Sequence, residues 1–83
     1  MKRSFTKFEE RLRAGALHAE ITKRALAHHV TLRELYEGVD RAPSISAARH
    51  AVYTWLSKKG KGVNEIARLF DRMPNGVSRM LKR

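Results

Sequence analysis

Cysteine is absent from this chain of 83 residues, and apolar residues never follow one another for more than two or three positions. Without cysteine the chain has no disulfide framework, no thiolate nucleophile and no cysteine-based zinc site. Without a long apolar run, we expect no membrane-spanning helix and no signal-peptide core. Both absences are compatible with a reducing compartment such as the cytoplasm.

Acidic residues are also few. The chain has 18 Lys and Arg against 8 Asp and Glu, which gives a formal charge of +10 and an isoelectric point of about 11.0. Such an excess favours a polyanionic partner. It is concentrated at one end, because residues 58–83 hold eight basic and two acidic side chains, whereas residues 15–57 hold five and four. A DNA-facing surface would have this distribution. The alternative is a basic protein whose charge only keeps it in solution.

Strand signals are missing too. No turn dipeptide separates two alternating apolar runs, and the single Asn-Gly pair, Asn75-Gly76, lies inside a helical pattern. The sequence therefore predicts an all-α fold, a single-domain small helical bundle of about five to six helices. Within it we expect an N-terminal helical extension at residues 1–15, supporting helices at residues 16–61 and a C-terminal helix-turn-helix at residues 62–83.

The N-terminal extension has the spacing of a capping box, with Thr6 as the cap and Glu9 three residues later. Phe5 and Phe8 are its aromatic residues. The sequence leaves open whether they pack on the main body, on a second subunit or on another protein. Gly15 is placed to end or to weaken this helix.

Three supporting helices follow. An apolar stripe predicts the first over residues 16–29, and Thr31 as a cap predicts a second, short one. The third and longest should run from Ser44, a natural N-cap, to Lys59, with Gly60 as the residue that ends it. Trp55 and Leu56 are its largest apolar side chains, so we expect this helix to be the centre of the core.

The last segment predicts two short helices that meet at a steep angle. Residues 63–70 carry an apolar stripe, and Pro74 suits the first position of a second helix at residues 74–82. Asp71, Arg72 and Met73 remain as a three-residue turn, the length typical of a helix-turn-helix. Amide, hydroxyl and cationic side chains then recur at helical spacing on the outer side of the second helix.

Such side chains suit the major groove, where Asn can bond adenine and Arg can bond guanine in pairs. The predicted base-reading residues are Arg72, Asn75, Ser78 and Arg79. The predicted contacts to the DNA backbone from this end of the chain are Lys58, Lys59, Lys61 and Lys82. The alternatives are a solvated helix face and, for Arg72, an arginine that only stabilises a helix end.

The order of motifs from about residue 30 to residue 81 resembles the C-terminal DNA-binding domain of DnaA, the bacterial chromosomal replication initiator. The matching runs are Val30 to Leu35, an apolar-Thr-Leu-x-Glu-Leu helix; Ala48 to Ala51, an Ala-Arg-His-Ala helix; and Glu65 to Phe70. The resemblance implies that Arg49 contacts a phosphate and that Arg41 lies in a basic loop beside the minor groove. For Arg49, an ion pair with Asp40 or Glu37 is the alternative.

The base-reading signature of that family is changed here. Its Asp-His-Ser/Thr-Thr positions are occupied by Met73, Pro74, Asn75 and Gly76, so the initiator's recognition sequence is not carried over. No Gly-x-x-x-x-Gly-Lys-Ser/Thr run is present to serve as a phosphate-binding loop. The resemblance thus implies a small regulator, from a phage or another mobile element, rather than an initiator.

The leading hypothesis is a sequence-specific double-stranded DNA-binding protein that regulates transcription or replication in a bacterial or phage-infected cell, close to the nucleoid. The second hypothesis is an adaptor that binds a replication or transcription protein through residues 1–29 or 74–83 and has only non-specific affinity for DNA. RNA binding has less support, because most aromatic residues lie on apolar stripes. A homodimer on two half-sites is compatible with a single helix-turn-helix of this size.

Catalysis and metal binding lack a pattern. The histidines His18, His28, His29 and His50 have no metal-ligand spacing, and no nucleophile, base and acid occur together in a recognisable motif. We therefore expect no enzyme activity, no metal or other cofactor, and no small-molecule substrate or membrane partner.

Overall fold

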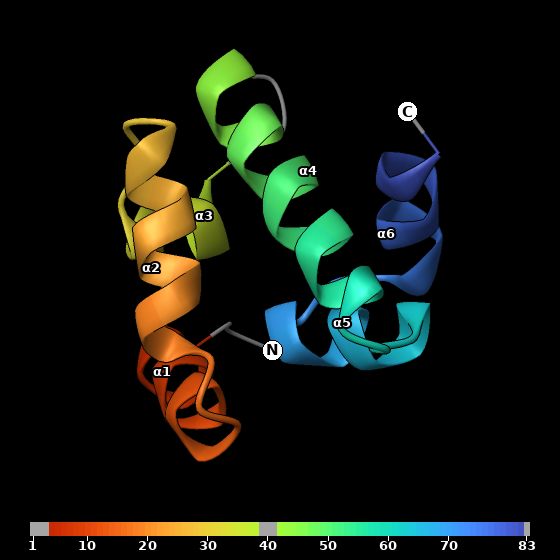
Figure 1. The fold of residues 1–83 in the computed structure, drawn as a ribbon, viewed down its shortest axis with the longest axis horizontal. Coiled ribbons are helices and arrows are strands. Elements are labelled where there is room, and N and C mark those ends of the chain that lie inside the picture. The colour runs from red at the N-terminus through yellow and green to blue at the C-terminus, as the bar shows by residue number, and fades with distance from the viewer. Residues whose placement is uncertain (1–3, 39–41, 83) are drawn as a thin grey trace.

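A computed structural model describes residues 4–38 and 42–82, and these residues form α-helices and short connections without a strand (Figure 1). The predicted all-α fold is thereby confirmed. The helices are α1 (Phe5–Ala14), α2 (His18–Ala27), α3 (Leu32–Glu37), α4 (Pro43–Lys58), α5 (Val63–Phe70) and α6 (Pro74–Leu81). None of these helices is long and apolar enough to cross a membrane.

Helix α4 is the centre of the arrangement and packs against α2, α3, α5 and α6. Helices α1 and α2 lie on one side of it and α6 on the other, with α5 below (Figure 1). Leu56 of α4 is fully buried, as predicted. Trp55 is only partly buried, at the edge of the core, where the guanidinium of Arg24 lies 4.5 Å and the ammonium of Lys59 lies 5.1 Å from its ring centroid.

Helix α1 is an integral part of the core. Its Phe8 is completely buried and stacks on Tyr36 of α3 with a centroid distance of 4.4 Å. The same ring lies 5.0 Å from Phe70 of α5, which in turn meets Tyr53 of α4 edge to face at 5.1 Å. This aromatic chain joins four helices. It answers the question that the sequence left open, because Phe8 packs on the main body of its own chain.

Two helices begin one or two residues earlier than predicted. Helix α1 is capped by Ser4, whose hydroxyl accepts a hydrogen bond of 3.2 Å from the amide of Lys7, so the expected cap, Thr6, lies inside the helix. Helix α4 begins at Pro43 after Ala42, and Ser44 is not its cap. Proline suits the first helical position because its φ is fixed and its missing N–H is one that the helix would leave unpaired. The predicted capping box at Thr31 is confirmed, with both of its hydrogen bonds to Glu34 formed.

Four helices end in the same backbone motif, in which one residue with positive φ reverses the chain. Gly60 takes this position after α4, as predicted, with φ of 95°. Ala16, His29 and Asp71 take it after α1, α2 and α5, with φ between 54° and 60°. In each case the following amide bonds back to a carbonyl five residues earlier, as in a Schellman motif. Non-glycine residues pay a steric cost here, so the connections are held by what surrounds them.

Candidate nucleic-acid interface

The turn between α5 and α6 has a fixed backbone geometry. Asp71 adopts the left-handed conformation (φ 54°, ψ 44°), and the amide of Arg72 donates to the carbonyl of Ala67 at 2.8 Å. Met73 is extended and Pro74 opens α6. The three-residue turn and the start of the second helix are as the sequence predicted. Asp tolerates the left-handed region better than most residues, because its short polar side chain can hydrogen-bond locally.

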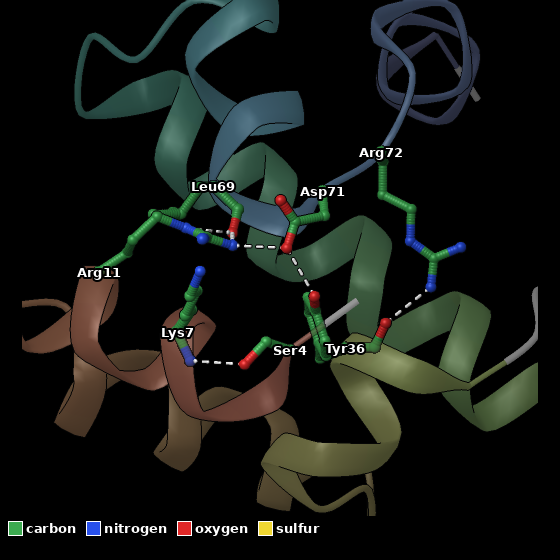
Figure 2. Close-up of polar contacts among 7 residues, drawn as sticks. All are labelled: Ser4, Lys7, Arg11, Tyr36, Leu69, Asp71 and Arg72. Atoms are coloured by element: carbon green, nitrogen blue, oxygen red, sulfur yellow. Dashed lines mark hydrogen bonds and ion pairs between the residues drawn. The ribbon is translucent and has the colours of Figure 1, made fainter. Parts of the chain in front are cut away.

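The side chain of Asp71 is held by two helices that lie far away in the sequence (Figure 2). Its Oδ2 accepts a hydrogen bond of 2.7 Å from Nη2 of Arg11 in α1 and one of 2.5 Å from the hydroxyl of Tyr36 in α3. Arg11 also donates through Nε and Nη2 to the carbonyl oxygen of Leu69, at 3.3 and 3.0 Å. A cation is favourable at this point because the last carbonyls of α5 have no partner within the helix. We call Arg11, Tyr36 and Asp71 the turn clasp.

The turn clasp has a predictable pH signature. Burial, followed by the hydrogen bond to Asp71 and its negative charge, raises the pKa of the Tyr36 phenol above its ordinary value of 10.0. The folded state therefore keeps this proton to higher pH than the unfolded chain does. The stability that this provides is complete below pH 10 and is lost as the pH rises through the raised pKa.

Tyr36→Phe tests this assignment. At neutral pH the variant should unfold with a free energy about 1.5 kcal/mol below that of the parent, because a hydrogen bond to a carboxylate is lost. The difference should shrink above pH 10, because the unfolded parent then loses the Tyr36 proton that the folded parent retains, which lowers the stability of the parent but not that of the variant. Urea titrations of both proteins between pH 8 and pH 11 measure it. A difference that stays constant over that range would contradict the raised pKa.

Two arginines converge on the carboxyl end of α3. The guanidinium of Arg49 donates to the carbonyl of Leu35 through Nε and Nη2, at 3.1 and 2.6 Å, and to that of Gly38 at 2.7 Å. Arg72 donates to the carbonyls of Tyr36 at 2.7 Å and Gly38 at 3.3 Å. Both cations thus donate to carbonyls that have no partner within the short helix, and both positive charges interact favourably with the dipole of α3.

This arrangement argues against two of the expected contacts. Arg49 is 1% exposed and donates to carbonyls inside the protein, a geometry that favours a structural role over the expected phosphate contact. Arg72 is half-buried and points back from the turn toward α3 (Figure 2), where its Nη2 already donates to the carbonyl of Tyr36. Of the two readings of Arg72, stabilisation of a helix end fits this geometry. Arg41 lies outside the described residues.

The remaining predicted base-reading residues lie on α6. Asn75 and Arg79 are exposed, and Ser78 is half-buried. Within the described residues, the side chains of Asn75 and Arg79 form neither a hydrogen bond nor an ion pair, so they are available to a ligand. The opposite side of α6 is anchored in the core by Val77 and Met80, both almost completely buried.

The predicted backbone contacts fall into two places. Lys58, Lys59 and Lys61 lie at the connection between α4 and α5, and Lys82 follows α6. Lys59 lies over the Trp55 ring, and the ammonium of Lys61 is 3.9 Å from the carboxylate of Glu65. These exposed or half-exposed interactions are weak enough for a phosphate to replace them.

Histidines and carboxylates do not gather into a metal site within residues 4–38 and 42–82, where no group of three or more could hold an ion. His18 lies instead 3.2 Å from a carboxylate oxygen of Glu9, which joins α1 to α2.

Comparison of the chain with protein-family models, with curated proteins and with solved structures gives no match.

Proposed function

We propose that this protein binds double-stranded DNA sequence-specifically, with α6 as the helix that enters the major groove. The observation that carries the proposal is the outer side of α6. It presents Asn75 and Arg79 without internal partners, on a helix whose inner side is locked into the core by Val77 and Met80. A helix that reads bases needs both free polar groups and a rigid support, because a helix that is already ordered loses little conformational entropy on binding.

Charge and turn geometry support the same proposal. The net charge of +10 supplies attraction to phosphates, and the lysines at the connection between α4 and α5 extend it beyond α6. The turn clasp holds Asp71, the residue at which the chain turns from α5 toward α6. Such a protein would act as a regulator by occupying a site, without enzymatic chemistry.

We further propose that residues 30–81 are a diverged relative of the DNA-binding domain of DnaA. The three matching runs fall on α3, α4 and α5 in the same order. The buried Arg49 differs from the role that the resemblance implied, and the residues at the start of α6 differ from the family's base-reading signature. The proposal therefore concerns architecture and leaves the target sequence to experiment.

Selection from a random duplex library tests the function directly. We expect an enriched motif that is bound at least about 10³-fold more tightly than a scrambled duplex at physiological salt. A symmetric motif would show two half-sites and hence a dimer. Equal, weak and salt-sensitive binding of both duplexes would contradict sequence reading and would leave charge as the only attraction.

Alanine variants separate base reading from phosphate binding. Arg79→Ala or Asn75→Ala should cost about 1 to 3 kcal/mol on the selected duplex and relax the preference at one base pair. Lys58→Ala should weaken both duplexes alike and reduce the slope of log affinity against log salt by about 0.9.

Arg13→Ala is the matched control for the Arg79 variant. It removes the same charge from an exposed position on α1, a helix that does not pack against α6. Its effect on the selected and the scrambled duplex should be small and equal. If Arg13→Ala and Arg79→Ala change binding to the same extent, α6 is not the reading helix.

A further inference from the structure

A groove of about 270 Å³ lies between α1, the connection from α1 to α2, and α5. Leu69 and the edge of Leu17, which is 6% exposed, provide its apolar surface, and Gly15 lines it without a side chain. This groove is formed by a different side of α5 from the one that packs in the core, since Ile66, Ala67 and Phe70 are buried. The reading helix α6 lies across α5 from α1 (Figure 1), so a ligand in the groove would leave α6 accessible.

The rim of the groove is cationic. Arg11, Lys61 and Arg68 contribute three positive charges, and Glu65 contributes one negative charge. Arg11 is already bonded to Asp71, and Lys61 is near Glu65. Arg68 is exposed and forms no ion pair with any residue that the structure describes, so its charge is uncompensated.

We propose that this groove binds an acidic segment of a partner protein, with one large apolar side chain of that segment against Leu69 and the exposed edge of Leu17, and its carboxylates facing Arg68 and Lys61. The volume, near the lower limit of about 300 Å³ for ligand sites, suits one or two side chains better than a larger molecule. A DNA phosphate would use the cations, but it gains nothing from the apolar surface. The combination of both favours a peptide with an acidic and apolar sequence.

The inference does not depend on sequence-specific DNA binding. It gives the domain a second surface, through which a protein could be held while α6 is on a duplex. The groove includes part of residues 1–29, which the sequence favoured for an adaptor, through Arg11, Gly15 and Leu17, and α5 supplies a second wall that the sequence did not indicate.

Binding of two fluorescein-labelled peptides tests the proposal. The first consists of Asp and Glu with one central Leu, and the second has Ser in place of that Leu. We expect the Leu peptide to bind about tenfold more tightly, because burial of the leucine adds to the charge attraction that both peptides share. Equal affinities would overturn the proposal, since charge alone would then explain the binding.

Charge reversal locates the site. Arg68→Glu should weaken binding of the Leu peptide about tenfold, whereas the matched variant Arg79→Glu, with the same charge change on α6, should weaken it about twofold or less. Equal effects of the two variants would overturn the proposal. Amide chemical shifts of the parent protein provide a test without substitutions, and we expect the Leu peptide to shift Gly15, Lys61 and Leu69.

Competition with a duplex distinguishes the other class of ligand. A duplex that displaces the Leu peptide and binds about tenfold less tightly to Arg68→Glu than to Arg79→Glu would make the groove a phosphate-binding surface and overturn the proposal. Simultaneous binding of duplex and peptide would support it. If the protein binds all duplexes alike while the peptide results are as expected, the proposed DNA function is wrong and the proposed peptide site in the groove still stands.

Discussion

Alanine in place of Phe8 is expected to lower the free energy of unfolding by about 3 to 5 kcal/mol, the range for truncating a fully buried aromatic side chain. Phe8 contacts Tyr36 and Phe70 and so joins α1 to α3 and α5. A domain of this length has a total stability of about 4 to 12 kcal/mol. The variant should therefore lose about a quarter or more of its stability and unfold at a clearly lower temperature, as circular dichroism during heating would show.

Phe5→Ala is the matched control. Phe5 is the neighbouring aromatic residue of α1, but it is only partly buried, with the guanidinium of Arg33 at 4.5 Å from its ring centroid. Its loss should cost about 1 to 1.5 kcal/mol. Equal losses for the two variants would show that α1 is not docked through Phe8.

The second large effect is expected at Arg49. Both Arg49→Met and Arg49→Lys should lower the free energy of unfolding by about 3 kcal/mol, because the carbonyls of Leu35 and Gly38 lose a charged donor inside the protein. Lysine should not rescue the loss. Its single ammonium cannot reproduce a guanidinium that donates through two nitrogens to one carbonyl and also reaches a second.

Arg79→Lys provides the comparison, because it makes the same exchange at an exposed position on α6 and should change stability by about 0.5 kcal/mol or less. Urea titration at neutral pH measures all three variants. A phosphate ligand at position 49 would predict the reverse, with stability unchanged and only the affinity for DNA reduced. That outcome would restore the role that the resemblance to DnaA implied.

Helices could be predicted well from the sequence because their signals are local. Gly62 to Phe70 carries an apolar stripe, Pro74 follows a three-residue turn, and Thr31 has its capping partner three residues away. The errors at Ser4 and Ala42 have local causes too. Two plausible caps compete within a few residues, and which one is used depends on how the first turn packs against the rest of the chain.

The turn clasp could not be predicted in the same way. Arg11, Tyr36 and Asp71 come from three separate segments, and nothing in a single sequence states that they meet. The aspartate in the turn was recognisable, but its contact with Tyr36 and Arg11 depends on the packing of α1. The burial of Arg49 could not be predicted for a related reason, because a cation on a helix is usually solvated and its burial requires acceptors that only the fold provides.

The exposed polar side of α6 was the part of the candidate site that the sequence predicted best. Asn75 and Arg79 are exposed where the helical spacing put them, since the apolar positions Val77 and Met80 fix which side of α6 faces inward. The spacing did not show that the side chain of Arg72, in the turn before α6, points toward α3. The backbone reverses at Asp71, so helical periodicity does not extend across it.

The contact between Arg11 and Asp71 joins residues that are sixty positions apart. While the chain is being synthesised from its N-terminus, α1 emerges with Phe8 and Leu12 before α5 exists to cover them. The core of this domain can therefore pack completely only after residue 70 has been added. Until then α2, α3 and α4 are incompletely packed. Formation of the fold is then a late event in which α1 and α5 become ordered together.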